Sequence, residues 1–257
     1  MRINFFEEYP TEGNMAKLDL VDWPATVLVT APSLKDFENV REKYARKYPH
    51  VTFGWWPTIP GSYWVSGFSN PSDLARLFSE ITSKKQVVEL PILMDLELPR
   101  KKYFYIKNLF NIGRNKKKIA EFLAKAPACN LKVYTAELPA FSRLVLNLFR
   151  AIGISPAFNL PHTKLPMVYS SMVLESAGKG TLNKIKAFEK RFALANPGRI
   201  GFGLGTIAVG VLGNEPIISP ALLAEDLEWA RECGAEEVFI FRLGGLNESY
   251  VSIIKNS

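Results

Sequence analysis

The stretch Val87-Val88-Glu89-Leu90-Pro91-Ile92-Leu93-Met94-Asp95-Leu96 is apolar at most of its positions. A parallel strand covered by helices on both faces of its sheet has this composition, because neither face meets water. The stretch therefore predicts a buried parallel strand over residues 87–96. Parallel neighbours are joined by crossover connections, usually helices, so strands and helices should alternate on either side of it.

Short apolar segments do alternate with amphipathic segments along the chain. The expected strands are residues 3–6, 25–30, 51–55, 87–96, 131–136, 166–170, 200–206 and 237–241. The expected helices are about residues 13–20, 33–48, 73–83, 101–125, 139–152, 181–194 and 221–233, with a last one from residue 250. Such alternation over about 250 residues predicts a single (β/α)8 TIM-type barrel, with residues 1–257 as one domain. The alternative, a doubly wound open sheet, usually has a glycine-rich turn after its first strand, where this chain has Glu-Glu-Tyr-Pro.

Composition excludes several classes of protein. The apolar fraction of 47% and the charged fraction of 22% are those of a soluble globular protein. The apolar runs are shorter than the roughly 18 residues that a membrane span needs, so no membrane partner is expected. Glu7 and Glu8 stand where a signal peptide would be apolar, which predicts a cytoplasmic protein. Gln86 is the only glutamine among many lysines and glutamates, as in thermophilic proteins.

Few residues could serve metal or redox chemistry. The chain has two cysteines, Cys129 and Cys233, and two histidines, His50 and His162. These are too few for a disulfide framework or a thiolate zinc site. We therefore expect no metal site and no cofactor.

The net charge of +7 and the pI of about 9.3 would attract polyanions if the charge were concentrated. The densest basic cluster is residues 114–118, with a second at residues 100–102. Such runs are usually solvated helix faces, and no aromatic-and-basic nucleic-acid motif accompanies them. A nucleic-acid partner is therefore not expected.

Acidic residues follow several of the predicted strands. Active sites of (β/α)8 barrels lie at the carboxyl ends of the strands, and here those ends carry Glu7 and Glu8, Asp95 and Glu97, and Glu137. Asp95 and Glu97 are two residues apart, so both point to one face of their strand. Two neighbouring carboxylates hold one proton more tightly, and a retained proton is what a general acid needs at neutral pH. Alternatively, these acids pair with Arg242 or a lysine in a network at the barrel mouth.

The remaining residues of the predicted site are less specific. Either Glu7 or Glu8 points inward, depending on the strand register, and Glu137 could instead be the amino-terminal carboxylate of the next helix. Trp55 and Trp56 give an aromatic surface on which a sugar ring can stack, or they belong to the core. We predict these side chains as substrate-binding residues: Glu7, Trp55, Trp56, Glu137 and Arg242. The expected ligand is a small-molecule carbohydrate.

Three segments resemble family-18 glycoside hydrolases, the chitinase-like barrels. Met94-Asp95-Leu96-Glu97 resembles the second half of their D-x-x-D-x-D-x-E signature, and Met167-Val168-Tyr169 resembles their Met-x-Tyr segment. Residues 134–140 are similar to their fifth strand. The chain departs from the family where Leu90 and Leu93 replace two signature aspartates, where residues 52–55 replace Ser-x-Gly-Gly, and where residues 241–242 lack the tryptophan of strand eight.

The resemblance implies catalytic roles for three residues. Glu97 would protonate the glycosidic oxygen, Asp95 would orient a substrate N-acetyl group, and Tyr169 would hydrogen-bond to that group. In that family the N-acetyl oxygen is itself the nucleophile. The implied function is acid-assisted cleavage of the glycosidic bond in small oligosaccharides, which include N-acetylated oligosaccharides.

Two alternatives remain at this point. Glycines follow the last two strands, where barrels often bind phosphate; the candidates are Gly205, Thr206, Gly244 and Gly245, assisted by Arg242. That site would belong to a lyase or isomerase of a phosphorylated small molecule, with a divalent metal held by Glu7, Asp95 and Glu137 to offset the acids. The second alternative is a non-catalytic ligand-binding barrel, with its mouth filled by side chains or its acids held in salt bridges.

Overall fold

The computed structural model describes residues 1–59, 63–83, 85–99 and 103–256. Eight strands, all paired in parallel, close into a barrel in the order β1 to β8. They are β1 (Arg2–Glu7), β2 (Ala25–Ala31), β3 (Val51–Pro57), β4 (Leu90–Leu96), β5 (Leu131–Glu137), β6 (Thr163–Val168), β7 (Phe202–Gly205) and β8 (Glu237–Phe241). This arrangement confirms the predicted (β/α)8 barrel.

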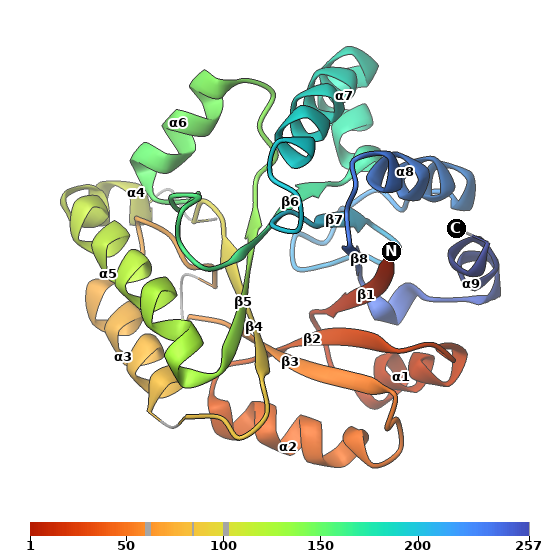
Figure 1. The fold of residues 1–257 in the computed structure, drawn as a ribbon, viewed down its shortest axis with the longest axis horizontal. Coiled ribbons are helices and arrows are strands. Elements are labelled where there is room, and N and C mark those ends of the chain that lie inside the picture. The colour runs from red at the N-terminus through yellow and green to blue at the C-terminus, as the bar shows by residue number, and fades with distance from the viewer. Residues whose placement is uncertain (60–62, 84, 100–102, 257) are drawn as a thin grey trace.

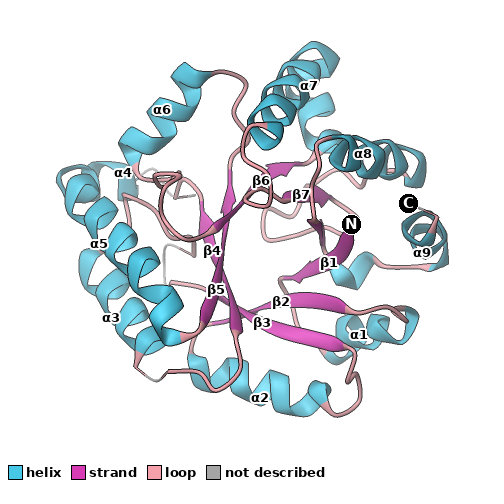
Figure 2. Cartoon of the chain, viewed as in Figure 1, coloured by secondary structure: helices cyan, strands magenta, loops and turns pink. Residues whose placement is uncertain are grey.

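Helices surround the strands on the outside of the barrel (Figures 1 and 2). They are α1 (Glu12–Met15), α2 (Leu34–Ala45), α3 (Pro71–Thr82), α4 (Tyr103–Asn108), α5 (Ile112–Lys125), α6 (Arg143–Ile152), α7 (Ser170–Leu194), α8 (Pro220–Glu232) and α9 (Glu248–Lys255). Short 3-10 turns are η1 (Ala16–Leu20), η2 (Leu109–Asn111), η3 (Ala126–Cys129) and η4 (Leu243–Gly245). Side chains of Ser33, Asn70, Ser142, Ser219 and Asn247 cap the helices that follow them. Within the described residues, no helix combines the length and the apolar character that crossing a bilayer requires.

Alternation along each strand divides the core into two layers. Outward side chains such as Phe5, Ile92 and Phe202 pack against the helices, and inward side chains such as Phe6 and Phe239 fill the barrel. Successive side chains of a strand point to opposite faces, so this division assigns a side to every strand residue. The barrel interior is therefore a packed apolar core below the strands' carboxyl ends.

Several predicted elements have different bounds in the structure, most clearly the fourth strand, the sixth strand and the helix that follows it. The fourth strand begins at Leu90, and Val87 and Val88 are exposed to solvent, because pairing with β5 begins at Leu90 opposite Leu131. The sixth strand begins at Thr163, before the predicted start at residue 166. α7 begins at Ser170 and is interrupted by a kink at Gly178, after which it follows the predicted helix of residues 181–194. Backbone pairing with β5 maintains the strand around Pro166 despite its missing N–H.

The barrel wall is tightly packed at Gly54, which lies on the inner face of β3. A Cβ atom there would lie 2.6 Å from a Leu28 methyl group and 2.7 Å from Pro91 Cβ. Gly54→Ala should lower the free energy of unfolding by about 1–3 kcal/mol, because a packed core accommodates an added methyl group poorly. Urea denaturation measures this change.

Gly113, at the start of α5, provides the matched control. A Cβ atom there has no neighbour within 4 Å, and φ is not positive. Gly113→Ala should leave stability unchanged or raise it by about 0.4–1 kcal/mol. Equal effects of the two substitutions would contradict the packing at Gly54.

Candidate active site

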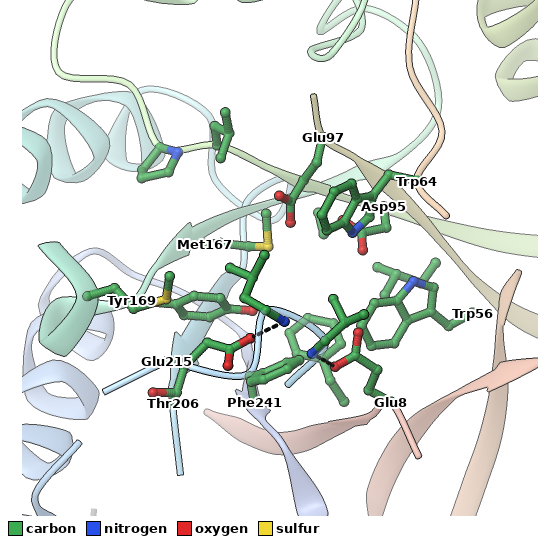
Figure 3. Close-up of a pocket in the computed structure, with 18 of the residues that line it drawn as sticks. Glu8, Trp56, Trp64, Asp95, Glu97, Met167, Tyr169, Thr206, Glu215 and Phe241 are labelled. Carbon is green, nitrogen blue, oxygen red and sulfur yellow. Dashed lines mark hydrogen bonds between the residues drawn. The ribbon is translucent and has the colours of Figure 1, made fainter. Parts of the chain in front are cut away.

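Inward-facing side chains at the strands' carboxyl ends surround a cavity at the barrel mouth (Figure 3). Its floor is the apolar inner layer of the barrel, including Phe6, Leu93 and Met167. The cavity has a volume of about 250 Å³, slightly below the usual range of small-molecule pockets. A compact ligand, of the size of one or two sugar rings, suits such a space.

Asp95 and Glu97 both face this cavity from the end of β4, as their spacing predicts. Asp95 is 3% exposed, and its Oδ1 atom has no hydrogen-bond partner within the described residues. The ion pairs found in the described part of the chain include neither acid. Among the described residues, the pair is therefore not held in a salt-bridge network, which was the alternative interpretation.

Burial controls the protonation of this pair. Desolvation, followed by the charge of Glu97, raises the pKa of Asp95 well above its ordinary value. Desolvation and the charge of Glu8 raise the pKa of Glu97 to about 7, although a hydrogen bond with Asp95 lowers it. At neutral pH the pair therefore retains a proton that it can deliver to a bound molecule.

Glu8, and not Glu7, is the acid of β1 that faces the cavity. Its Oε1 accepts a 2.6 Å hydrogen bond from the Tyr63 hydroxyl, and its Oε2 accepts one of 2.8 Å from the Val211 N–H. Desolvation raises the pKa of Glu8, and these two hydrogen bonds oppose the rise. Glu8 stands across the mouth from the Asp95–Glu97 pair in Figure 3.

Glu215 is a further carboxylate of the cavity that sequence patterns did not indicate. It lies in the loop between β7 and α8 and accepts a 2.9 Å hydrogen bond from the Leu212 N–H (Figure 3). Its Oε2 atom is buried without a hydrogen-bond partner in the described part of the chain. No strand alternation or helical spacing applies to such a loop, so its direction was not predictable.

The cavity also has an aromatic wall formed by Trp56, Trp64, Tyr169 and Phe241. The Tyr169 and Phe241 rings lie 5.7 Å apart. Burial raises the pKa of the Tyr169 hydroxyl far above its ordinary value, so the hydroxyl stays protonated and can donate a hydrogen bond. Trp56 was predicted here, and Trp64 comes from the loop after β3.

Trp55 does not lie in the cavity, which corrects its prediction as a substrate contact. It is fully buried on the outer side of β3, where it stacks on Phe37 of α2 at 6.1 Å. Its Nε1 donates a 2.9 Å hydrogen bond to the Ala31 carbonyl. Adjacent residues of a strand face opposite sides, so only one of two consecutive tryptophans can face the mouth.

Glu7 and Arg242 form an ion pair behind the cavity wall, which corrects both as predicted substrate contacts. Arg242 Nη1 lies 2.9 Å from Glu7 Oε1, and the Glu7 side chain is fully buried. Backbone N–H groups of Tyr9 and Gly244 also donate to Glu7, at 2.7 and 2.6 Å. Burial nevertheless raises the pKa of Glu7, so desolvation outweighs these favourable contacts. The pair joins β1 to η4.

Glu137 faces the helices and not the cavity, a third correction. Lys164 Nζ lies 3.2 Å from Glu137 Oε2, and the Thr135 hydroxyl donates to Oε1 at 2.7 Å. Both charged side chains are almost completely buried, at 3% and 1% exposure. Glu137 occupies the outward face because its neighbour Ala136 occupies the inward one.

The predicted phosphate-binding glycines contact protein groups. A Cβ atom on Gly205 would lie 2.6 Å from the Phe241 carbonyl oxygen, and one on Gly245 would overlap the Ile207 carbonyl. The Gly244 N–H donates to Glu7 and the Gly245 N–H to the Arg242 carbonyl. These glycines permit close backbone packing, and the N–H groups of Gly244 and Gly245 already donate to protein acceptors.

One residue of the predicted phosphate-binding set lines the cavity, and the predicted metal ligands do not come together. Thr206 lines the cavity, and its hydroxyl donates to the Pro216 carbonyl. The proposed metal set of Glu7, Asp95 and Glu137 is divided between the two faces of the barrel wall. Among the described residues, no group of three or more His, Cys, Asp or Glu side chains is placed to hold a metal ion.

A (β/α)8 barrel with a carboxylate-and-aromatic cavity at its mouth is the class that fold and site define. No protein-family model and no curated protein sequence matches the chain. Among solved structures, it is similar to the Bacillus megaterium spore cortex-lytic enzyme SleL, with a TM-score of 0.60, 13% identity, and coverage of 99% of this chain and 73% of that one. It is also similar to the Methylomonas D-allulose 3-epimerase, with a TM-score of 0.55, 10% identity, and coverage of 100% and 97%.

A third similar structure is the Prevotella bryantii endo-β-mannanase/endo-β-glucanase, with a TM-score of 0.54 and 12% identity. The alignment covers 98% of this chain and 48% of that one. At such identities these similarities show the fold alone.

The buried Glu137–Lys164 pair yields a stability prediction. Lys164→Met should lower the free energy of unfolding by about 3–5 kcal/mol, because it leaves a buried carboxylate without its counter-charge. Adding Glu137→Leu should recover much of this loss. Urea denaturation of the single and double variants measures both changes, and an additive double variant would show that the two side chains do not interact.

Proposed function

We propose that this protein is a glycoside hydrolase that cleaves small oligosaccharides with acid assistance from Glu97. N-acetylated oligosaccharides are among the proposed substrates. The observation that carries the proposal is a buried, proton-retaining carboxyl pair beside an aromatic wall in an open cavity. Glycosidic cleavage needs a proton on the leaving oxygen and a negative group near the oxocarbenium-like transition state. The pair of Glu97 and Asp95 can supply both.

Each side chain of the cavity has a role in this scheme. Glu97, with a pKa raised to about 7 by desolvation, protonates the glycosidic oxygen. Asp95 orients an N-acetyl group or stabilises the developing positive charge, and the Tyr169 hydroxyl donates a hydrogen bond to the same part of the substrate. Trp56 and Trp64 provide flat surfaces for a sugar ring.

The solved structures with this fold support a carbohydrate ligand. The three similar structures are a cortex-lytic enzyme, a sugar epimerase, and an enzyme with endo-β-mannanase and endo-β-glucanase parts. A phosphorylated substrate receives less support, because the cavity is lined by acidic side chains and Gly244 and Gly245 donate their N–H groups within the protein.

Glu97→Gln should lower kcat/KM by about 10²–10⁴-fold, because the amide cannot donate the proton that cleavage requires. The measurement is a screen of aryl-glycosides, including N-acetylated ones, at elevated temperature. Loss should be larger for substrates with a poor leaving group, since these depend most on protonation.

The exposed acid Glu12 on α1 provides the control for this variant. Glu12→Gln should retain full activity, and both variants should show the wild-type circular dichroism spectrum. Unchanged turnover by Glu97→Gln would remove Glu97 from the mechanism.

The raised pKa of Glu97 predicts the pH dependence of activity. Its acid form predominates below about pH 7 and is lost as the pH rises through the pKa of about 7. kcat/KM should therefore fall about tenfold per pH unit above that value. A profile that stays flat from slightly acidic to clearly alkaline pH would contradict Glu97 as the general acid.

A further inference from the structure

The positive charge of the chain is concentrated on the elements that follow β4 and β5. Residues 103–120 contain five lysines and arginines and no aspartate or glutamate. Residues 138–163 contain Arg143 and Arg150 and again no acidic residue. Residues 100–102, the second basic cluster of the sequence, lie outside the described residues. These elements therefore carry a net positive charge, although α5 also contains Glu121, whose Oε1 lies 3.9 Å from Lys117 Nζ.

Large apolar side chains project from the same elements into solvent. Phe110 is 95% exposed, Ile106 82% and Leu144 80%, and Leu109 and Leu148 are more than half exposed. Leu144 and Leu148 are four residues apart, so they share the outer face of α6, while Leu146 on its inner face packs with Phe188. A helix normally turns its apolar face inward, so α6 has an additional apolar stripe that the barrel does not cover.

The exposed side chains of α4 and η2 and those of α6 belong to elements that are linked in space. η2 leads directly into α5, and the start of α5 lies beside the end of α6. A Cβ atom on Gly67 would meet both Ile112, at the start of α5, and Ile152, at the end of α6. Lys116 Nζ donates a 3.3 Å hydrogen bond to the Ala151 carbonyl. We call this surface the basic apolar patch, and it comprises Ile106, Leu109, Phe110, Leu144 and Leu148.

We propose that the basic apolar patch docks the protein on an anionic membrane surface. Exposed aliphatic and aromatic side chains insert into the boundary between headgroups and acyl chains, and flanking cations attract anionic headgroups. Lys107, Arg114 and Arg143 are exposed and provide those cations.

Other occupants fit the patch less well. A second copy of the chain bound through the same patch would bring Lys107, Arg114 and Arg143 of both copies close together, which is repulsive. A nucleic acid would satisfy the cations but leave four aliphatic side chains without apolar partners. The lipid surface matches both the charge and the apolar character.

The patch and the cavity are linked along the chain by the segment that leaves β5. Leu138 and Pro139 line the cavity, and α6 begins at Arg143 a few residues later. The membrane proposal stands independently of glycosidic cleavage, because it uses none of the cavity residues.

Cosedimentation with lipid vesicles tests the proposal. The purified protein should bind vesicles of phosphatidylcholine containing phosphatidylglycerol, and binding should weaken at high salt because screening reduces the attraction to the headgroups. Vesicles of phosphatidylcholine alone should bind much less. The double variant Phe110→Ser/Leu144→Ser should bind the anionic vesicles at least about tenfold more weakly, because two large apolar groups no longer enter the membrane.

Matched substitutions separate the patch from general hydrophobicity and charge. Val87 and Val88 are exposed apolar residues before the amino end of β4, and Val87→Ser/Val88→Ser should bind as the wild type does. Lys107→Gln should weaken binding about fivefold, as expected for one cation at an anionic surface. Thermal unfolding should show that all variants remain folded.

Three results would overturn the proposal. The first is no binding to anionic vesicles at low salt, and the second is equal binding by the patch and control double variants. The third is a different occupant: a dimer in light scattering that Phe110→Ser/Leu144→Ser dissociates, or binding of an oligonucleotide in preference to vesicles. Loss of glycosidase activity in any variant does not bear on this proposal.

Discussion

The alternation of side chains across a closed wall of parallel strands is the constraint on which the other features depend. In a closed barrel each strand is paired on both edges, so its register, and with it the side that each residue faces, is determined. This constraint places Asp95 and Glu97 in the cavity together. It also places Glu8 and Trp56 inside the barrel mouth, and their neighbours Glu7 and Trp55 outside it.

The same geometry explains why acids on the two sides of the wall differ chemically. Outside, Glu7 and Glu137 face Arg242 and Lys164, and their charges stabilise the packing of loops and helices on the barrel. Inside, Asp95 and Glu97 face an apolar and aromatic cavity without a cationic partner among the described residues, and desolvation raises the pKa of both. The inner pair can transfer its proton to a molecule in the cavity, whereas Glu7 and Glu137 contact cationic side chains and do not line the cavity.

Charge is segregated over the molecule as well as within the site. The chain has a net charge of +7, yet its cavity is lined by four carboxylates, Glu8, Asp95, Glu97 and Glu215. Part of the basic excess lies instead around the basic apolar patch on α4, η2 and α6. The two regions are joined through the segments that leave β4 and β5, so one part of the barrel rim supports both the proposed chemistry and the proposed docking.

The sequence by itself predicted the barrel and that Asp95 and Glu97 share one face of their strand, because repeated strand and helix patterns and an i, i+2 spacing are local properties. It could not decide between Glu7 and Glu8, or between Trp55 and Trp56, since that choice depends on the register of each strand with its neighbours. It also placed Glu137 and Arg242 in the site, where the structure pairs them with Lys164 and Glu7 outside the cavity. Glu215 entered the site through a loop whose path is set by packing against β1 and β8 residues distant in sequence, and only the tertiary structure brings such groups together.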